Sequence, residues 1–241
     1  AALCDEAIRA LSALLHLAER SGNFPTSMQS CMVVLISKPC GGLRPITLFR
    51  AVYRLYSRTR SKHVREWAQN HLKHPAVNMA AGRQVLDATW RLMARQQASS
   101  KTRGGFAADL LWDFRKAFEC VNRDRLWSTA LRHKYPLDLL RLSLSSYECG
   151  RHLVMGDLCT RPIRPRRGIA AGSAFATFEL SLYLWDIVIE HASQHPNVTL
   201  SIHVDDFSQS TSAHNEDETI DTVISSALAL HNKLTDLGMP H

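Results

Sequence analysis

Two acidic stretches decide the fold: Leu111-Trp112-Asp113-Phe114-Arg115-Lys116-Ala117-Phe118 and His203-Val204-Asp205-Asp206. In the first, residues 106–113 alternate between two faces, with Asp109 and Asp113 on the same face. Alternation over this length, in a run rich in apolar residues, predicts a β-strand. Asp113 therefore stands at the predicted end of a strand.

The second stretch predicts a β-hairpin. Residues 199–204 alternate, with Leu200, Ile202 and Val204 on one face. We expect Asp205-Asp206 to form the bend and Phe207 to begin the return strand.

A basic segment that contains glycine lies between them, Arg166-Arg167-Gly168-Ile169-Ala170-Ala171-Gly172-Ser173. We expect Gly172-Ser173 to open a long helix that runs to about Ala192, with Ser173 as its N-cap. Glycine permits close approach of the backbone, and a helix N-terminus favours anions. The segment suits contact with a phosphate, and its plainer interpretation is only the start of a helix.

Carboxylates at neighbouring strand ends suit metal-assisted phosphoryl transfer. That reaction needs cations that neutralise the developing charge, and a pair of Mg²⁺ ions about 3.5–4 Å apart supplies them. Hard cations prefer carboxylate oxygens, so Asp113 and Asp205 are the candidate ligands. Two alternatives stay open, because Asp is common in structural turns and Asp109 shares the strand face of Asp113.

The rest of the chain predicts helices mixed with short strands. Apolar residues recur at helical spacing in residues 3–19, 49–67, 84–98, 137–148 and 218–237. Asn122 or Asp124 is expected to cap a further helix that ends near His133. Apolar runs at 32–36 and 43–48, separated by the turn 39–42, predict a hairpin, and residues 99–105 predict a loop. The pattern indicates an α+β fold.

Positive charge is segregated along the chain. The net charge is +7, and no Asp or Glu occurs between Arg20 and Arg65. On the predicted helix 49–67, four basic residues share one face: Arg54, Arg58, Lys62 and Arg65. A second basic cluster comprises Arg161, Arg164, Arg166 and Arg167. Such clusters favour a polyanion partner, although a solvated helix face is the alternative for any single one.

Cysteine spacing and hydropathy indicate which kinds of site and which location to expect. The 6 cysteines show no C-x-x-C spacing, which indicates neither a zinc site nor a disulfide framework, and we expect an intracellular location. No run of about 18 apolar residues occurs, so no membrane span is expected. The chain starts at Ala1 without a signal-peptide pattern, and we expect it to be an excerpt of a longer protein.

Taken together, the motifs resemble the reverse transcriptase family, nearest to the type found in retrotransposons without long terminal repeats. The resemblance runs in order from about residue 31 to residue 238. Residues 34–46, Val-Leu-Ile-Ser-Lys-Pro-Cys-Gly-Gly-Leu-Arg-Pro-Ile, resemble the fingers hairpin of that family. The resemblance implies that Lys38 and Arg44 hold the incoming triphosphate.

The remaining motifs resemble the palm of the same family. The resemblance implies that Asp113 and Asp205 bind the metal, with Asp206 beside them, and that Phe118 forms the gate beneath the sugar that selects deoxynucleotides. It also implies nucleotide contacts for Phe114, Arg167 and Gly172. The basic residues Arg54, Arg58, Lys62, Arg65, Arg164 and Arg166 would then follow the backbone of the nucleic acid.

This resemblance implies a right-hand polymerase fold in which helices pack on a small antiparallel palm sheet and the thumb is absent. Residues 1–104 are expected to form a fingers-like region. Residues 105–241 are expected to form the palm, with motifs at 109–121, 166–177 and 201–208 and a helical insertion on the fingers side at about 122–160.

The implied function is DNA synthesis from an RNA template. Its expected partners are an RNA template, a DNA primer and deoxynucleoside triphosphates, and its cofactors are two Mg²⁺ ions, for which Mn²⁺ can substitute. The location would be nuclear if the chain belongs to a eukaryotic retrotransposon.

The sequence departs from the family pattern at four positions: Glu119, Ala171, Ala174 and His203. None of these changes removes a metal ligand, but His203 and Ala171 bear on nucleotide fit. They leave open a catalytically silent RNA-binding module that retains the fold. An RNA-dependent RNA polymerase is a third hypothesis, against which the bulky Phe118 argues.

Overall fold

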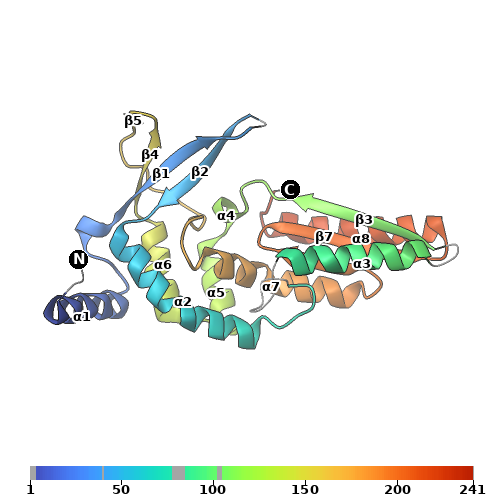
Figure 1. Ribbon diagram of the computed structural model, residues 1–241, viewed down its shortest axis with the longest axis horizontal. Helices are drawn as coiled ribbons and strands as arrows, with labels where there is room; N and C mark the ends of the chain where they lie inside the picture. Colours follow the sequence, from blue (N-terminus) through green and yellow to red (C-terminus); the bar gives the residue numbers. More distant parts are fainter. Residues whose placement is uncertain (1–3, 40, 78–84, 102–104, 241) are drawn as a thin grey trace. The chain divides into compact units, whose positions relative to one another are not determined.

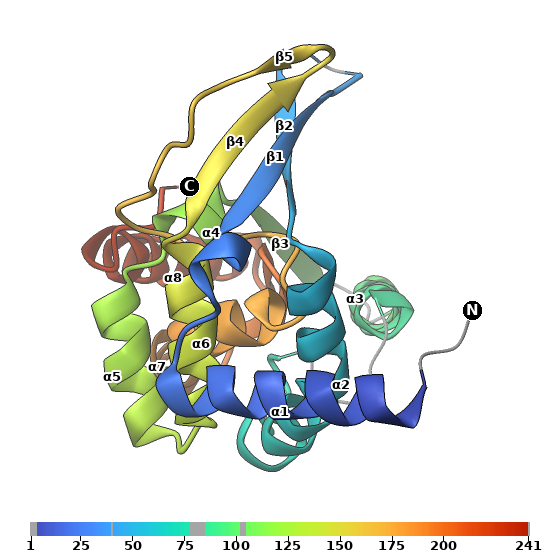
Figure 2. The same ribbon diagram turned by 90° about the vertical axis from the view of Figure 1, so that its left-hand side faces the viewer.

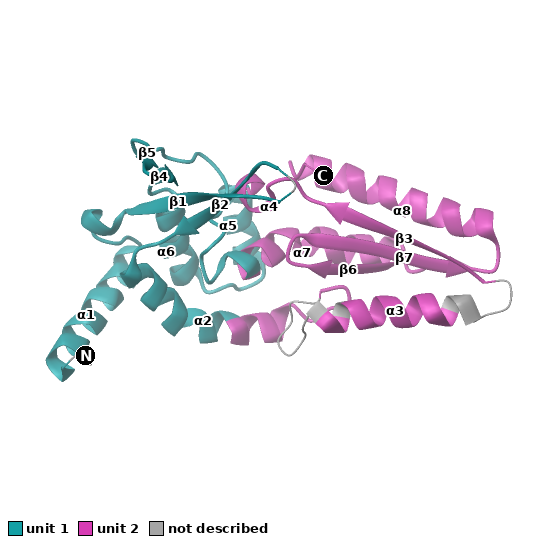
Figure 3. Ribbon diagram, turned by 45° about the horizontal axis from the view of Figure 1, so that its top comes forward, with its two compact units in different colours: residues 1–64, 122–177 teal, residues 65–121, 178–241 magenta. Residues whose placement is uncertain are grey.

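The computed structural model describes residues 4–39, 41–77, 85–101 and 105–240 (Figure 1). The chain divides into two compact units, each built from two separate segments (Figure 3). Unit 1 comprises Ala1–Val64 and Asn122–Thr177, and unit 2 comprises Arg65–Val121 and Phe178–His241.

Helices and short strands alternate along the described chain. The helices are α1 (Asp5–Ser21), the 3-10 helix η1 (Thr26–Met28), α2 (Ala51–His71), α3 (Val85–Lys101), α4 (Ala117–Cys120), α5 (Arg123–Arg132), α6 (Leu137–Tyr147), α7 (Ala176–Gln194) and α8 (Glu216–Asp236). The strands are β1 (Ser30–Ser37), β2 (Leu43–Leu48), β3 (Phe106–Asp113), β4 (Gly150–Met155), β5 (Leu158–Cys159), β6 (Thr199–His203) and β7 (Asp206–Ala213). The expected α+β class is confirmed.

Unit 1 contains a four-stranded sheet of order β2-β1-β4-β5. β1 and β2 form the predicted antiparallel hairpin, and β4 adds to β1 in parallel. Figure 2 shows these strands extending away from the helices of the unit. The sequence did not predict β4, because only Leu153, Val154 and Met155 of its residues are strongly apolar and its partner β1 is far away in the chain.

Aromatic side chains build the core of unit 1. Phe49 stacks on Tyr53 with ring centroids 4.2 Å apart, and Phe24 meets Tyr53 and Tyr56 edge to face. Tyr56 also meets Phe175, which precedes α7. Tyr53 and Tyr56 lie on the inner face of α2, and the other rings pack against that face. The basic residues of the helix therefore lie on its outer face.

Unit 2 contains a three-stranded antiparallel sheet of order β3-β7-β6. On one face, Leu200, Ile202 and Phe207 are buried. Helix α8 packs against β3 and β7, and α3 runs beside β3 and β6 (Figure 3). The opposite face carries Asp109 and Asp113, both exposed, as the alternation predicted.

A polar network lies inside unit 2. The Trp112 indole N–H donates to Gln209 Oε1 at 2.9 Å, and the Gln209 amide donates to Ser226 at 2.8 Å and meets His191 Nε2 at 3.1 Å. His191 Nε2 also lies 3.0 Å from Ser226 Oγ. This network joins β3, β7, α7 and α8.

Several predicted boundaries change. β2 and β3 begin and end where predicted, whereas α3 continues through Lys101 into the expected loop 99–105, whose residues 102–104 lie outside the described part. Asn122 is confirmed as the cap of α5, since its side chain accepts a hydrogen bond from Arg125 N. Helix α7 begins at Ala176, after a turn in which Ser173 Oγ accepts from Phe175 N.

The compact units do not divide at the expected boundary near residue 104. Residues 65–101 belong to unit 2, and residues 122–177 join the N-terminal segment in unit 1. The assignment of fingers and palm to particular residues stays a prediction. In the described part of the chain, no helix is long and apolar enough to cross a membrane.

Candidate active site

Asp113 and Asp206 lie directly opposite each other at one end of the unit 2 sheet. The antiparallel register pairs Asp113 at the end of β3 with Asp206 at the start of β7, and Asp206 with His203 at the end of β6. Residues paired in this way share a face and have Cα atoms about 4.5–5.5 Å apart. Like charges in such a pair repel, so the sheet brings two carboxylates together at a cost in stability.

Asp205 sits in the turn between β6 and β7. The turn consists of Val204 and Asp205, so the bend falls one residue earlier than predicted and Asp206 already belongs to the return strand. Burial, reinforced by the charges of Asp206 and Asp113, raises the pKa of the Asp205 carboxyl. The charges of Asp206 and Asp113 therefore both act on Asp205.

Backbone strain accompanies these carboxylates. Among the described residues outside glycine, positive φ occurs at Lys116 (58°), Lys134 (54°) and Val204 (59°). Val204 precedes Asp205, and Lys116 follows Asp113 by three positions. A β-branched residue seldom adopts this conformation, and such outliers cluster at functional sites.

The chemistry of this donor set fits a hard divalent cation. Among the described residues, no Lys or Arg forms an ion pair with Asp113, Asp205 or Asp206. His203, which stands opposite Asp206 in the sheet, partly offsets the rise in the pKa of Asp205. Carboxylate oxygens are the ligands that Mg²⁺ prefers. The side chains are not gathered into a coordination shell, since the described part of the chain contains no group of three or more His, Cys, Asp or Glu placed to hold a metal ion.

The two candidate phenylalanines differ in their surroundings. Phe114 is only 6% exposed and meets Phe207 edge to face at 4.8 Å, so its ring packs in the core of unit 2. Phe118 lies half-buried on α4. Packing thus accounts for Phe114, whereas Phe118 retains an exposed surface.

In unit 1, Lys38 and Arg44 lie on the β1–β2 hairpin. Lys38 N donates to Gly42 O at 3.1 Å and closes the turn, and Arg44 stands opposite Ile36. Both side chains are exposed, and neither forms an ion pair with a described residue. The hairpin therefore presents two cations available to an anionic ligand. Cys40 of the predicted turn lies outside the described residues.

Gly172 lies against the backbone of that hairpin. Its φ is +116°, and a Cβ atom at this position would lie 2.3 Å from Thr47 O. Thr47 N donates to Ala171 O at 3.3 Å, and Tyr53 and Ser173 share a hydrogen bond of 2.8 Å. A side chain at residue 172 has no room, so the glycine sets how closely residues 171–173 approach β2.

Arg123 supports the basic segment and was not predicted from the sequence as a functional residue. Its guanidinium donates to Gly168 O at 2.8 Å, to Tyr147 O at 3.2 Å and to the carbonyls of Pro165 and Arg167 at 3.3 Å. No local motif reveals this role, because its partners are backbone carbonyls far along the chain. The bonds hold residues 165–168 in place.

The predicted backbone-binding residues are all exposed. This set comprises Arg54, Arg58, Lys62 and Arg65 on α2 together with Arg164 and Arg166, and Arg167, a predicted nucleotide contact, is exposed beside them. Arg65 begins a segment of unit 2, and the others belong to unit 1. Their exposure is compatible with a polyanion or with solvent.

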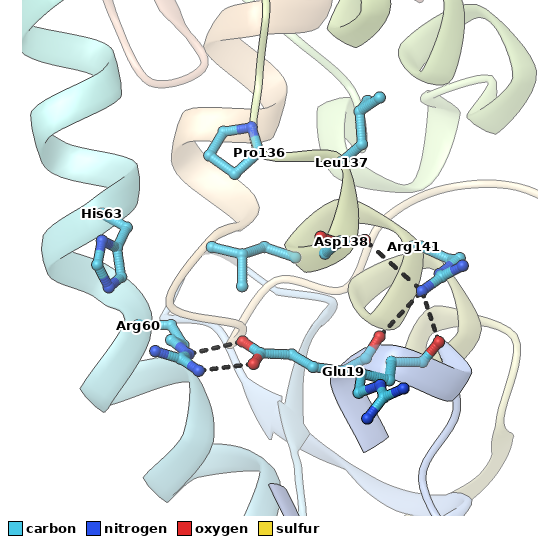
Figure 4. A pocket seen from close by; sticks show the side chains of 9 residues that line it. Glu19, Arg60, His63, Pro136, Leu137, Asp138 and Arg141 are labelled. Atoms are coloured by element: carbon cyan, nitrogen blue, oxygen red, sulfur yellow. Dashed lines mark hydrogen bonds and ion pairs between the residues drawn. The ribbon is translucent and has the colours of Figure 1, made fainter. Parts of the chain in front are cut away.

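A separate cavity of about 660 Å³ lies in unit 1 between the end of α1, α2 and the start of α6 (Figure 4). Arg60 donates to both carboxylate oxygens of Glu19 at 2.6 Å, and Arg141 donates to the carbonyls of Glu19 and Arg20 at 3.0 Å. None of the described residues that line this cavity is a predicted site residue. These interactions of Arg60 and Arg141 attach α1 to α2 and α6.

Comparison with solved structures identifies the fold. Three structures of telomerase from Candida tropicalis are similar to this chain. The apo enzyme truncated from its C-terminal domain has a TM-score of 0.59 at 15% identity over 88% of this chain and 48% of that chain. The complex with the TWJ fragment of telomeric RNA has a TM-score of 0.60 at 12% identity, over 88% of this chain and 40% of that chain. The apo enzyme has a TM-score of 0.60 at 14% identity, over 98% of this chain and 47% of that chain.

The chain therefore has a fold like that of reverse transcriptases, to which telomerase is related. It spans less than half the length of these telomerase chains. No protein-family model matches the sequence, and no curated protein matches it at a significant level.

Proposed function

We propose that the protein is a nucleotidyltransferase that synthesises DNA on an RNA template. The observation that carries the proposal is the arrangement of carboxylates in unit 2, where Asp113 stands opposite Asp206 and Asp205 occupies the adjoining turn. The charges of Asp113 and Asp206 act against the charge of Asp205, and none of the three carboxylates forms an ion pair with a Lys or Arg among the described residues. A divalent cation bound by the three carboxylates would offset this repulsion and would explain why the fold retains it.

Asp113, Asp205 and Asp206 would hold two Mg²⁺ ions, or Mn²⁺ in their place. When bound, these ions supply the charge that activates the attacking hydroxyl and stabilises the leaving oxygen. The chain contributes the fixed strand ends that position the three carboxylates. Because of the turn at Val204, Asp205 lies at the same end of the sheet as Asp113 and Asp206.

Unit 1 supplies the residues proposed to bind the nucleotide. Lys38 and Arg44 bind the triphosphate, and Arg167 contacts the phosphates or groups near them. Gly172 contributes through the backbone, since it lets residues 171–173 lie close to the strand that carries Arg44. Arg123 holds the segment that carries Arg167.

Phe118 is the proposed selector of the sugar. Its ring is half-buried, so packing fixes it while one surface stays open. A ring beneath the sugar would collide with a 2′-hydroxyl, and deoxynucleotides would be preferred. This role argues against synthesis of RNA.

The exposed basic residues of α2 and of residues 164–167 bind the phosphates of the RNA template and DNA primer. One similar telomerase was solved with a fragment of telomeric RNA, which supports RNA as the partner here. An origin in a retrotransposon without long terminal repeats, with a nuclear location in a eukaryote, is the finer proposal and rests on the sequence motifs.

A second function is favoured by specific observations. The carboxylates are not gathered into a coordination shell in the described residues, and His203 and Ala171 depart from the family pattern. A module that binds RNA without catalysis would keep the basic surface and the fold. Such a module would bind RNA but would not incorporate nucleotides.

Primer extension on an RNA template tests both functions. The full-length protein is assayed with Mg²⁺ and deoxynucleotides, beside Asp113→Asn, Asp205→Asn and the control Asp221→Asn, an exposed acid on α8. Extension by the wild type and the control, with a loss of at least about a thousandfold in the two site variants, supports the polymerase. Absence of extension from folded protein that binds RNA supports the silent module.

A further inference from the structure

Two buried thiols face each other in unit 1, and the proposed function uses neither. Cys31 lies on β1, and Cys149 lies between the end of α6 and the start of β4. Their sulfur atoms are 3.6 Å apart, and the residues are 3% and 8% exposed. Both are free thiols.

The sheet fixes this pair at bonding range. β1 and β4 run in parallel with Ser30 opposite Gly150 and Cys31 opposite Arg151, so Cys149 is held one position before its ladder begins. A disulfide has a sulfur–sulfur distance of about 2.05 Å. Closing the remaining roughly 1.6 Å needs small side-chain rotations and no separation of the strands.

The surroundings of Cys149 favour its thiolate. A hydrogen bond from Cys31, together with the positive charges of Arg151 and Arg123, lowers the pKa of the Cys149 thiol against the opposing effect of burial. The same hydrogen bond and burial raise the pKa of Cys31 well above its usual range. In the neutral pair the Cys149 thiol donates to Cys31 Sγ, and once Cys149 ionises Cys31 becomes the donor. The two thiols thus have different roles, a nucleophile and a resolving thiol.

The spaces beside the two thiols differ in size. Cys31 lines a cavity of about 470 Å³ that is also bordered by Arg50 and His152. Cys149 borders a space of only about 10 Å³, about what one water molecule needs. Only a small oxidant suits Cys149, and hydrogen peroxide is small, whereas a tripeptide disulfide or a bulky azo compound is far larger.

We propose that Cys31 and Cys149 form an oxidation site that hydrogen peroxide converts into a disulfide between β1 and the end of α6. The Cys149 thiolate attacks one peroxide oxygen, the O–O bond breaks, and the hydroxide that leaves takes up a proton to become water. The sulfur of Cys31 then attacks the sulfenic acid on Cys149, the S–O bond breaks, and the hydroxide leaves as water with the Cys31 proton. Two thiols lose two electrons, and one peroxide becomes two water molecules.

Peptide mapping of the full-length protein tests this site without any assay of polymerase activity. Folded protein is treated with hydrogen peroxide and then unfolded in iodoacetamide, and the peptides are identified by mass spectrometry. We expect a cross-linked peptide containing Cys31 and Cys149, removed by a reductant. Buried Cys120, which has no neighbouring sulfur partner among the described residues, is expected to be alkylated as before.

Three further measurements sharpen the result. Diamide, a bulky oxidant, should modify exposed Cys4 and Cys159 and leave the pair reduced. Cys31→Ser should trap the Cys149 sulfenic acid as a dimedone adduct, whereas Cys149→Ser should leave Cys31 unmodified. The oxidised wild type should unfold at a temperature higher by at least about 5 °C, because the bond closes a long loop.

Two outcomes overturn the proposal. One is that peroxide oxidises Cys4 and Cys159 while Cys31 and Cys149 remain fully alkylated. The other is that Cys149 accumulates as a sulfinic acid beside a free Cys31, which would mean that the pair does not close. Both are read from the wild type alone, so they stand even if a serine variant fails to fold.

Discussion

Asp205 bears a charge that opposes folding. Because its pKa is raised in the folded protein, the folded state favours the protonated carboxyl more than the unfolded chain does. The protonated group therefore contributes stability below its ordinary pKa, and that contribution is lost as pH rises through the raised pKa of the folded state. At neutral pH the ionised Asp205 is a net cost. A charge kept at such a cost points to function.

Asp205→Asn is expected to raise the free energy of unfolding by up to about 1 kcal/mol while abolishing primer extension, because it removes repulsion from Asp206 and Asp113. Chemical denaturation of the variant and of wild type measures this difference. The control Asp221→Asn should change stability by less than about 0.5 kcal/mol. A fall in stability for Asp205→Asn would contradict the repulsion inferred at this turn.

Phe118→Ala is expected to increase the use of ribonucleotides relative to deoxynucleotides by roughly ten- to a hundredfold, since it removes the proposed clash with a 2′-hydroxyl. The ratio of kcat/KM for the two nucleotides measures it. Phe114→Leu is the matched control, because Phe114 is buried against Phe207 and should affect stability alone. Equal ratios for Phe118→Ala and wild type would remove Phe118 from sugar selection.

Gly172 is expected to be essential to the contact between residues 171–173 and β2. Gly172→Ala combines a φ of +116° with a Cβ atom 2.3 Å from Thr47 O, and we expect a loss of about 2–4 kcal/mol in unfolding free energy. Gly41→Ala also carries a positive φ, +91°, but its Cβ would meet no atom within 4 Å. Thermal denaturation of both variants separates the steric clash at residue 172 from the backbone strain that both positions share. Similar losses of stability in both variants would contradict the close approach of residue 172 to β2.

His191 should make unit 2 sensitive to acid. Burial and the charges of His195 and Lys233 lower its pKa to about 4, and the amide of Gln209, oriented by Trp112, requires an acceptor at Nε2. The unfolded chain binds a proton near pH 6.5, so stability is complete above that pH and is lost as pH falls toward 4, by up to about 3 kcal/mol.

Denaturation at pH 7 and pH 4.5 measures this loss. His191→Gln should flatten the pH dependence, and His214→Gln, at an exposed position, should leave it unchanged. If His191→Gln loses as much stability between pH 7 and pH 4.5 as the wild type does, another group controls the acid sensitivity.

Elements with strong local signals were predicted well. β3 and the hairpin of β1 and β2 follow from alternation and a glycine turn, and Asn122 followed from helix-capping chemistry. β4 was missed because its pairing with β1 depends on a partner distant in the chain. The bend at Val204 was placed one residue late, because a β-branched residue at positive φ runs against local preference.

Charge along the whole chain predicts salt-dependent binding of RNA. Arg54→Ala with Arg58→Ala should reduce the slope of log affinity against log salt by about 1.4, if each side chain neutralises one phosphate of a single strand. Fluorescence anisotropy over a salt series measures the slope. Arg9→Ala with Arg125→Ala, also exposed, is the control and should keep the wild-type slope. An unchanged slope in the α2 variant would mean that this face is merely solvated.

The candidate site could be predicted only in part. The acidic residues were proposed from their order and their places at strand ends, and Lys38 and Arg44 from the family resemblance. The structure places each of them at a strand end or on a hairpin. The sequence could not separate Phe114, a core residue, from Phe118, because both are aromatic residues near one acidic strand end. Arg123 was missed because its partners are carbonyls that only tertiary structure brings within reach.

The most direct test of the carboxylate site is Mn²⁺ binding measured by electron paramagnetic resonance. The full-length protein is titrated in complex with an RNA template, a chain-terminated DNA primer and the matching deoxynucleotide. We predict two bound Mn²⁺ ions in the wild type and in Asp221→Asn, with loss of at least one in Asp113→Asn and in Asp205→Asn. Equal binding by the wild type and both site variants would contradict the metal site proposed here.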